Sequence, residues 1–282
     1  MKQYIPRIID QELTHSLDVA GAVLIKGPKA CGKSETAKQQ AKSILQVDSD
    51  PQVAPLMGID PTALLDGATP RLIDEWQAQP RLWNYIRHAV DDRSSKGQFI
   101  LTGSANPVEE VSMHSGAGRF IELHMHTMSW QELGYSDGYV SLAGLFDGKP
   151  IKAKEYKTDI HTIIQRLVIG GWPGLVGLDE ADARQVNTSY VRLLTEVDLS
   201  RVSNVKRDPV RVRYLLQSLA RNLSTITEIS TFIRDIQNVA GDDISRPTVV
   251  DYLDALDRLM IIEDQPAWNT HIRSSAKLRK SP

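Results

Sequence analysis

Apolar residues in the first half of the chain fall into short continuous runs separated by stretches with helical spacing. Residues 22–25 are all apolar, which favours a strand buried on both faces of a parallel sheet. Similar runs recur at residues 44–47, 72–73, 99–101 and 120–123. Their alternation with helical stretches from about residue 20 to residue 135 predicts a parallel α/β sheet covered by helices.

Three stretches before or between these runs have the composition and spacing of helices. Residues 5–20 are predicted to form a short amphipathic helix with Ile8, Leu13 and Leu17 on one face. Residues 34–44 are rich in helix-favouring residues, and a third segment carries apolar residues at helical spacing: Leu82, Ile86, Ala89 and Val90.

The pattern changes after residue 135. Residues 136–158 are rich in Gly, Asp, Lys and Ser, which predicts an irregular connection. Residues 160–202 have helical spacing, interrupted at residues 170–174. Three further helical runs are predicted within residues 209–264.

The apolar residues and caps of these three runs define their ends. The first run carries Val212, Leu215, Leu216, Leu219 and Leu223. The second is predicted to open with a capping box formed by Thr225 and Glu228. The third starts at Ser245 with Pro247 in its first turn, and it places four residues on one face: Val249, Leu253, Leu256 and Met260.

Composition narrows the class of protein. At 282 residues, 41% hydrophobic and 24% charged, the chain suits about two globular domains. Its net charge of −2 gives no general attraction to nucleic acid or membrane. The single cysteine, Cys31, fits a reducing compartment, and no apolar run is long enough to span a bilayer or act as a signal peptide. We therefore expect a soluble, cytoplasmic protein without membrane contact.

The segment Gly27-Pro28-Lys29-Ala30-Cys31-Gly32-Lys33-Ser34 fits the pattern G-x-x-x-x-G-K-[ST] at every fixed position. Its glycines let the backbone fold round an anion with N–H groups facing the phosphates, and the following helix N-terminus adds to the field. Lys33 is predicted to reach the β- and γ-phosphates, and the Ser34 hydroxyl to ligate Mg²⁺. Together with Glu35, this loop is the predicted ATP site.

Two carboxylates, Asp74 and Glu75, follow the apolar run at residues 72–73. The carboxyl end of a strand is where open α/β sheets bind ligands. Asp74 is predicted to hold Mg²⁺, directly or through water, and Glu75 to act as the general base on the attacking water. Because the nucleophile of a kinase arrives with its substrate, the acidic pair favours hydrolysis over phosphoryl transfer.

Small polar residues and an arginine complete the candidate site. If the strand at residues 99–101 lies between the strand of the phosphate loop and the acidic strand, Thr102 or Ser104 points at the γ-phosphate. Arg119, just before the run at residues 120–123, is suited to the charge that builds on phosphoryl oxygens. It acts either in the site of a neighbouring subunit or merely as the partner of a local acid.

Cysteine and histidine residues add little to this site. Cys31 is interpreted as a small spacer, although a thiol beside a helix N-terminus is a candidate for reactivity. His124 and His126 lack further ligands at zinc-site spacing, which favours packing or surface roles.

Several motifs resemble a large prokaryotic family of AAA-type ATPases that carry a C-terminal nuclease-like domain of unknown function. The resemblance rests on LIDEWQ at residues 72–77, GQFILTGS at 97–104, the phosphate loop, Gly118-Arg119 and Gly170-Gly171-Trp172-Pro173. It implies a nucleotide site formed by Lys33, Ser34, Asp74, Glu75 and Ser104. It also implies an arginine finger at Arg119 and a winged-helix segment after the ATPase core.

The sequence departs from this family at its C-terminus. The family continues into the nuclease-like domain, whereas this chain stops at Pro282 after a basic tail containing Arg273, Lys277, Arg279 and Lys280. We therefore expect a truncated or split form of the family, with no nuclease activity assigned. The predicted organisation is an ATPase core at 1–135, a connection and helical segment at 136–208, a winged-helix-like domain at 209–268 and the basic tail at 269–282.

Residues 225–237 and 245–260 resemble the last two helices of a winged helix-turn-helix. The second of them has a largely acidic polar face, which is poor for meeting phosphates: Arg246, Asp251, Asp254, Asp257 and Arg258. DNA binding, protein contact and a nucleotide lid are therefore all candidate roles for residues 209–268.

These observations predict a Mg-dependent ATPase whose hydrolysis drives a conformational change acting on a protein or DNA partner, with a homo-oligomer as a candidate assembly. The alternatives are a nucleotide-dependent DNA- or protein-binding module with incidental hydrolysis, and a P-loop kinase. The chain contains no Asn-Lys-x-Asp string that would specify guanine, which favours ATP.

Overall fold

The computed structural model describes residues 3–104, 116–151, 158–202, 207–241, 243–266 and 280–281. Two compact units divide the chain, the first containing described residues up to Val186 and the second those from Asn187 onward. This division lies inside a helix, whereas the predicted boundaries were placed after residues 135 and 208.

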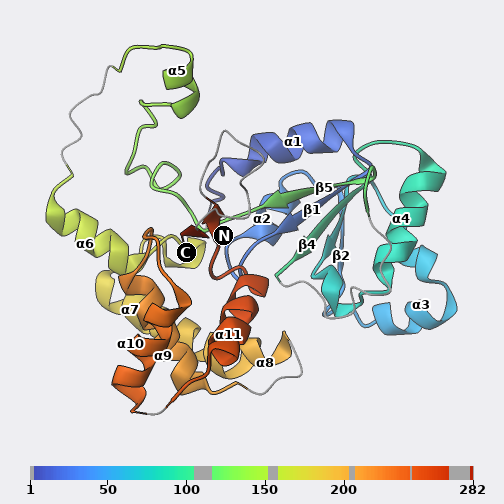
Figure 1. Ribbon diagram of the computed structural model, residues 1–282. Coiled ribbons are helices and arrows are strands. Elements are labelled where there is room, and N and C mark those ends of the chain that lie inside the picture. Colours follow the sequence, from blue (N-terminus) through green and yellow to red (C-terminus); the bar gives the residue numbers. More distant parts are fainter. Residues whose placement is uncertain are drawn as a thin grey trace, which may run out of the picture. The chain divides into compact units, whose positions relative to one another are not determined.

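A five-stranded parallel sheet with the order β2-β3-β4-β1-β5 forms the centre of the first unit (Figure 1). Its strands are β1 (Ala22–Lys26), β2 (Ser43–Gln46), β3 (Arg71–Asp74), β4 (Phe99–Gly103) and β5 (Phe120–His124). The predicted parallel α/β sheet is confirmed. Strand β4 lies between β1 and β3, which is the position predicted to direct Thr102 or Ser104 toward the γ-phosphate.

Alternate strand residues enter two hydrophobic cores, one on each face of the sheet. Leu24 of β1 belongs to the core that contains Trp83 of α4 (Leu82–Arg93). Its neighbour Val23 belongs to the other core, with Leu13 of α1 (Ile9–Val19) and Ala37 of α2 (Lys33–Lys38). Figure 1 shows α1 and α4 on different sides of the sheet. Burial on both faces explains why the strands are continuous apolar runs.

The first unit contains further helices besides α1, α2 and α4. They are α3 (Val53–Ile59), η1 (Pro61–Leu65), η2 (Trp76–Ala78), α5 (Leu142–Phe146), α6 (Ile160–Ile169) and η4 (Pro173–Leu175), and α7 (Glu180–Leu193) contains the division between the units.

Three predicted elements of the first unit have different bounds in the structure. The first helix begins at Ile9, so Ile9 takes the core position expected for Ile8, which is exposed. Helix α2 ends at Lys38 instead of continuing to residue 44, because the chain joins the sheet where the Lys42 amide donates to Pro70 O at 2.8 Å. A short helix, α5, lies in the segment expected to be irregular, with Ser141 capping its first turn.

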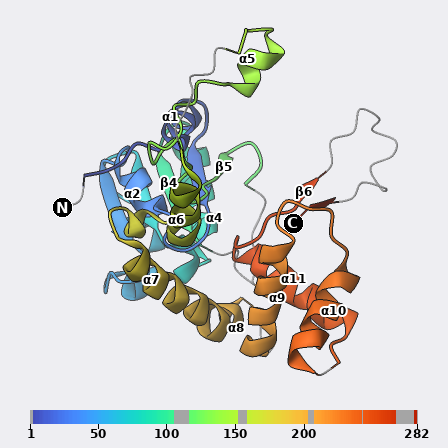
Figure 2. The same ribbon diagram turned by 90° about the vertical axis from the view of Figure 1, so that its left-hand side faces the viewer.

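The second unit contains a helical run and a three-helix core (Figure 2). Its elements are η5 (Leu194–Asp198, a π-helical turn), α8 (Leu199–Arg201), α9 (Pro209–Arg221), α10 (Ile229–Ala240), α11 (Arg246–Arg258), β6 (Gln265–Pro266) and β7 (Lys280–Ser281). Leu215, Ile236 and Leu256 bring α9, α10 and α11 together. The two short strands pair antiparallel after these helices. Helices followed by a strand pair have the element order of a winged helix, which stays a prediction here.

Caps in the second unit test the predicted helix ends. Ser245 accepts a hydrogen bond from the Thr248 amide at 3.3 Å, which confirms the start of α11. The predicted capping box is wrong, because Glu228 is the N-cap of α10 and the Thr225 hydroxyl donates to Asn222 O.

Residues near the other helix ends also differ from the prediction. Leu223 lies beyond α9 and is exposed, and Met260 follows the end of α11. Arg273, Lys277 and Arg279 of the basic tail lie outside the described residues. Among the helices that the structure describes, none is both long and apolar enough to cross a membrane.

Candidate phosphate-binding site at the sheet edge

The loop of residues 27–32 joins β1 to α2 at the carboxyl edge of the sheet. Gly27 is required by close packing, because a Cβ here would lie 2.1 Å from Met125 O. Gly32 and Ala30 both have left-handed backbone, with φ of 104° and 66°. Left-handed residues within such a turn produce the anion-binding concavities of phosphate loops. The local backbone therefore suits the role predicted from the motif.

Lys33, in the first turn of α2, is folded back over this loop. Its ammonium group donates to Gly27 O at 2.9 Å and to Pro28 O at 3.0 Å, and the residue is 5% exposed. Burial lowers the pKa of Lys33, although the nearby carboxylates of Glu75 and Asp74 act in the opposite direction. A buried ammonium group that donates to carbonyl oxygens gains a stronger, charge-assisted partner when it meets an anion.

Ser34, Asp74 and Thr102 meet at the same edge of the sheet. The Ser34 hydroxyl donates to Asp74 Oδ1 at 2.7 Å, and the Thr102 hydroxyl donates to the same carboxylate oxygen. Asp74 ends β3 and Thr102 lies in the adjacent β4, and both are buried. Mg²⁺ prefers hard oxygen ligands and takes few of them from protein. The Ser34 hydroxyl and the Asp74 carboxylate fit that requirement.

Glu75 follows β3 in a left-handed conformation, with φ 53° and ψ 45°. For a non-glycine residue this conformation costs on the order of 1–2 kcal/mol, so the surrounding contacts must hold it. Its amide donates to Thr102 Oγ1 at 3.4 Å, and the Gln77 side chain donates to its carboxylate. Sequence reasoning did not assign a role to Gln77. Its spacing of two residues from Glu75 was the only available signal.

Ser104 and Arg119 are not brought into this network. Ser104 is half-buried and lies one residue past the end of β4, so Thr102 is the sensor candidate that contacts the acidic pair. Arg119 precedes β5 at the opposite, amino-terminal edge of the sheet. The four residue-to-residue steps from Phe120 to His124 span roughly 13 Å, so Arg119 lies at least that far from the edge where the phosphate loop begins. There Arg119 Nε donates to Asp91 at 2.5 Å and lowers the pKa of that carboxyl.

The other residues considered for the site differ in how exposed they are. Glu35 is exposed and pairs with Lys38 at 2.6 Å, while Lys29 lies exposed on the loop. Cys31 is fully buried, and burial raises the pKa of its thiol, which argues against a reactive cysteine. His124 and His126 are exposed, and no group of His, Cys, Asp and Glu in the described ranges is arranged to hold a metal ion.

Two residues that the sequence analysis missed lie behind the loop. Arg7 and Glu132 form a buried ion pair, with Arg7 Nε 2.9 Å from Glu132 Oε1. The same guanidinium donates to the loop carbonyl of Cys31. No sequence signal could find this pair, because 125 positions separate its members.

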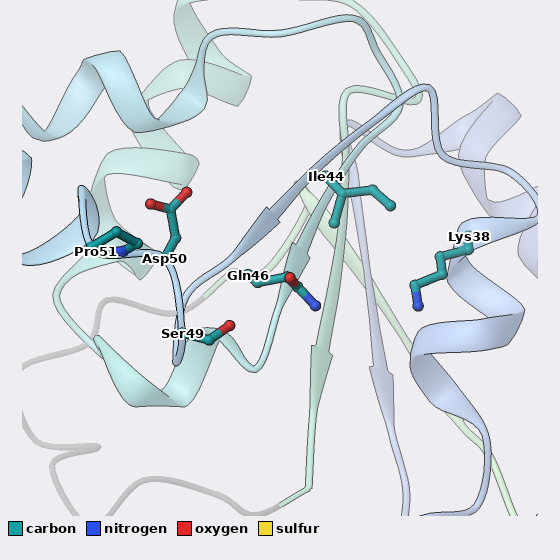
Figure 3. A pocket seen from close by; sticks show the side chains of 6 residues that line it. All are labelled: Lys38, Ile44, Gln46, Ser49, Asp50 and Pro51. Atoms are coloured by element: carbon teal, nitrogen blue, oxygen red, sulfur yellow. The ribbon is translucent and has the colours of Figure 1, made fainter.

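Two cavities lie near α2. The first, of about 340 Å³, adjoins the first turn of the helix and is lined by Gln3, Tyr4, Ile5, Arg7, Gly32, Glu35, Thr36, Met128, Pro173 and Val176. The second, of about 540 Å³, lies along the edge strand β2 (Figure 3). Lys38 lines it from α2, Ile44 and Gln46 from β2, and Ser49, Asp50 and Pro51 from the segment that follows. Only the first cavity includes a residue of the phosphate loop.

The strand order, the loop conformation and the clustered acidic and hydroxyl groups give the first unit a P-loop fold. Comparison with known families agrees, because residues 20–134 match the family described as "AAA domain". Residues 160–282 match a second family, described as "Domain of unknown function (DUF8612)".

A solved structure has a fold similar to that of this chain. The chain resembles the solved Walker-type ATPase PABY2304 of Pyrococcus abyssi with a TM-score of 0.53 and 16% identity, covering 91% of this chain and 90% of that one. At this identity the likeness shows the fold.

Two curated relatives are uncharacterized proteins. They are Rv2008c of Mycobacterium tuberculosis and Mb2031c of Mycobacterium bovis, each 23% identical over 274 residues. The match covers 96% of this chain and 55% of each relative, so the chain spans about half their length.

Proposed function

We propose that this chain binds Mg-ATP through residues 27–35 and hydrolyses it with the acidic pair Asp74 and Glu75. The observation that carries the proposal is the hydrogen-bonded cluster of Ser34, Asp74 and Thr102 beside the phosphate loop and Lys33. Three segments distant in the sequence contribute to this cluster. A merely structural glycine turn gives no reason for them to converge on one carboxylate.

Each group has a defined task in this reaction. The loop amides and Lys33 would bind the phosphates, and Ser34 and Asp74 would hold Mg²⁺, which neutralises phosphate charge when bound. Glu75 would accept a proton from the water that attacks the γ-phosphorus, while the bond to the ADP oxygen breaks. The contacts from Thr102 and Gln77 orient the acidic pair for this step.

The nucleoside would occupy the smaller cavity beside α2. Its lining combines apolar side chains such as Met128 and Val176 with the polar groups of Tyr4 and Thr36. Cavities of roughly 300 Å³ and larger with mostly apolar walls are typical small-molecule sites. Because Gly32 lines it, a phosphate chain bound on the loop would lead directly into this cavity.

A hydrolysis assay of Glu75→Gln tests the proposal. The substitution keeps the size of the side chain but removes the proton acceptor, so we expect kcat for phosphate release to fall by about 10²–10⁴-fold. ATP affinity, measured by calorimetry, should stay within a few-fold of the wild-type value. Glu180→Gln, in an exposed ion pair with Arg184, is the matched control and should leave both quantities unchanged.

The same assay separates the competing functions. Phosphate release that is unchanged in Glu75→Gln, with ATP still bound, would favour a nucleotide-dependent binding module. Repeating both measurements with duplex DNA would show whether nucleic acid alters turnover. If the wild-type protein did not bind ATP, both the ATPase and the nucleotide-dependent binding module would be excluded.

A further inference from the structure

Arg7 connects three segments of the first unit through one buried guanidinium. Its side chain is 5% exposed. Nε donates to Glu132 Oε1 at 2.9 Å, Nη1 to Cys31 O at 2.9 Å, and Nη2 to His126 O at 2.8 Å. The arginine therefore joins the chain before α1, the phosphate loop and the segment after β5.

Glu132 is equally well satisfied. It also accepts hydrogen bonds from the Ile8 amide at 2.8 Å and the Ser129 amide at 2.7 Å. Although burial opposes ionisation, these amides and Arg7 hold the pKa of Glu132 below its ordinary range. The pair is thus a charged, buried anchor, and removing one partner leaves the other charge uncompensated.

The contact with Cys31 bears directly on the shape of the phosphate loop. A loop that directs its N–H groups toward an anion leaves carbonyl groups on its outer side, and buried ones need a donor. Arg7 supplies that donor for the carbonyl immediately before Gly32. The guanidinium also packs on the loop, since a Cβ at Gly32 would lie 3.3 Å from Arg7 Nη1.

The neighbouring residues hold Arg7 in place. Asp10 accepts a hydrogen bond from the Arg7 amide at 2.8 Å and another from the Tyr4 hydroxyl at 2.7 Å. The Tyr4 hydroxyl also lies 3.0 Å from Thr36 Oγ1 in α2. The segment before α1 therefore contacts both the phosphate loop and α2, the helix that follows this loop.

We propose that Arg7 is a positioning residue for the phosphate loop, which it holds in the binding conformation through the Cys31 carbonyl, with Glu132 as its counter-ion. The expected effect of Arg7 on ATP binding rests on the proposed function. Its expected effect on the conformation of the phosphate loop rests on the geometry of the protein alone.

Cys31 provides a built-in probe for this proposal, because it is the only cysteine among the 282 residues. Its thiol is fully buried and contacts Met125 O at 3.5 Å. A thiol-specific chromogenic reagent should therefore react slowly with the folded wild-type protein. Opening of the loop would expose the thiol and accelerate the reaction.

The experiment compares the wild-type chain of 282 residues with Arg7→Lys in the absence of nucleotide. Lysine keeps the charge but cannot serve three acceptors with a planar fork, so we expect Cys31 to react about ten-fold faster or more. Amide hydrogen exchange should accelerate in residues 29–34 and stay unchanged in β1 and β4. With Mg-ATP, KM should rise by about ten-fold while kcat stays within about two-fold. Arg184→Lys, in an exposed ion pair, should match the wild type in every measurement.

Three results would overturn the proposal. The first is a folded Arg7→Lys protein with wild-type thiol reactivity and loop exchange. The second is exchange that increases evenly across the sheet, because Arg7 would then serve the fold as a whole. If Arg7→Lys does not fold, Glu132→Gln replaces it, because that substitution removes the counter-ion that fixes the guanidinium. We expect faster reaction of Cys31 and faster exchange confined to the phosphate loop in that variant. Wild-type values there, or acceleration spread evenly across the sheet, are the third overturning result. Since neither readout contains nucleotide, a protein without ATPase activity would refute the proposed function and leave this test intact.

Discussion

The two edges of the same parallel sheet differ in whether their charged residues are buried or lie at the surface. At the carboxyl edge, Lys33, Asp74 and Thr102 are buried, and Ser34 and Thr102 share one carboxylate oxygen. At the amino-terminal edge, Arg119 pairs with Asp91 on the exposed surface.

This difference follows from the direction of the strands. All five strands run the same way, so the chain leaves β1 and β3 at one edge, where the phosphate loop, the start of α2 and the acidic pair meet. Buried charges there interact strongly because little water screens them, whereas an exposed pair is screened. The phosphate-loop motif assigned Lys33 to the phosphates, whereas Arg119 was left with two candidate roles, and the two residues lie at opposite edges of the sheet.

Of the substitutions that test the difference between the two edges, removal of the Lys33 charge should have the largest effect on ATP binding. Lys33→Met keeps most of the side-chain volume but cannot bind phosphate, so we expect ATP affinity to fall by about 100-fold. Calorimetric titration with Mg-ATP measures the change. Lys96→Met alters an exposed lysine that precedes β4 at the opposite edge of the sheet and is the matched control. Equal affinities for the two variants would contradict the role of Lys33.

Removing the Thr102 hydroxyl should have an intermediate effect. Thr102→Val preserves the buried shape but deprives Asp74 and the Glu75 amide of a partner, so we expect kcat to fall by about ten-fold with little change in ATP affinity. Ser104→Ala should change kcat less. If Ser104→Ala had the stronger effect, the sensor role would belong to Ser104, as the family resemblance implied.

Removing Arg119 should have the smallest effect on the chain's own site. Because the residue lies at the far edge, Arg119→Ala is expected to leave ATP affinity and kcat within about two-fold at low protein concentration, consistent with the modest value of exposed ion pairs. Asp91→Asn should behave in the same way. If kcat of the wild type instead rises with protein concentration and Arg119→Ala abolishes only that rise, the arginine acts in a neighbouring subunit.

Local sequence was sufficient to predict the strands and the phosphate loop. Continuous apolar runs identified the five strands, and the fixed glycines, Lys33 and Ser34 identified the loop at the end of β1. Predictions were less accurate where neighbouring segments decided the outcome. Helix α2 is shorter than its composition suggested, because the sheet captures the chain at Lys42. The N-cap of α10 is Glu228 instead of Thr225 for a different, local reason, since the Thr225 hydroxyl donates to Asn222 O three residues earlier.

By itself, the sequence determined the class of chemistry: an anion-binding loop and an acidic pair, each written in consecutive residues. Only the tertiary structure decided which groups meet, namely Thr102 with Asp74, Arg7 with Glu132 and Cys31, and Arg119 with Asp91. The physical reason is that a motif depends on short-range backbone geometry, whereas these contacts depend on strand order and on packing between residues far apart in the chain.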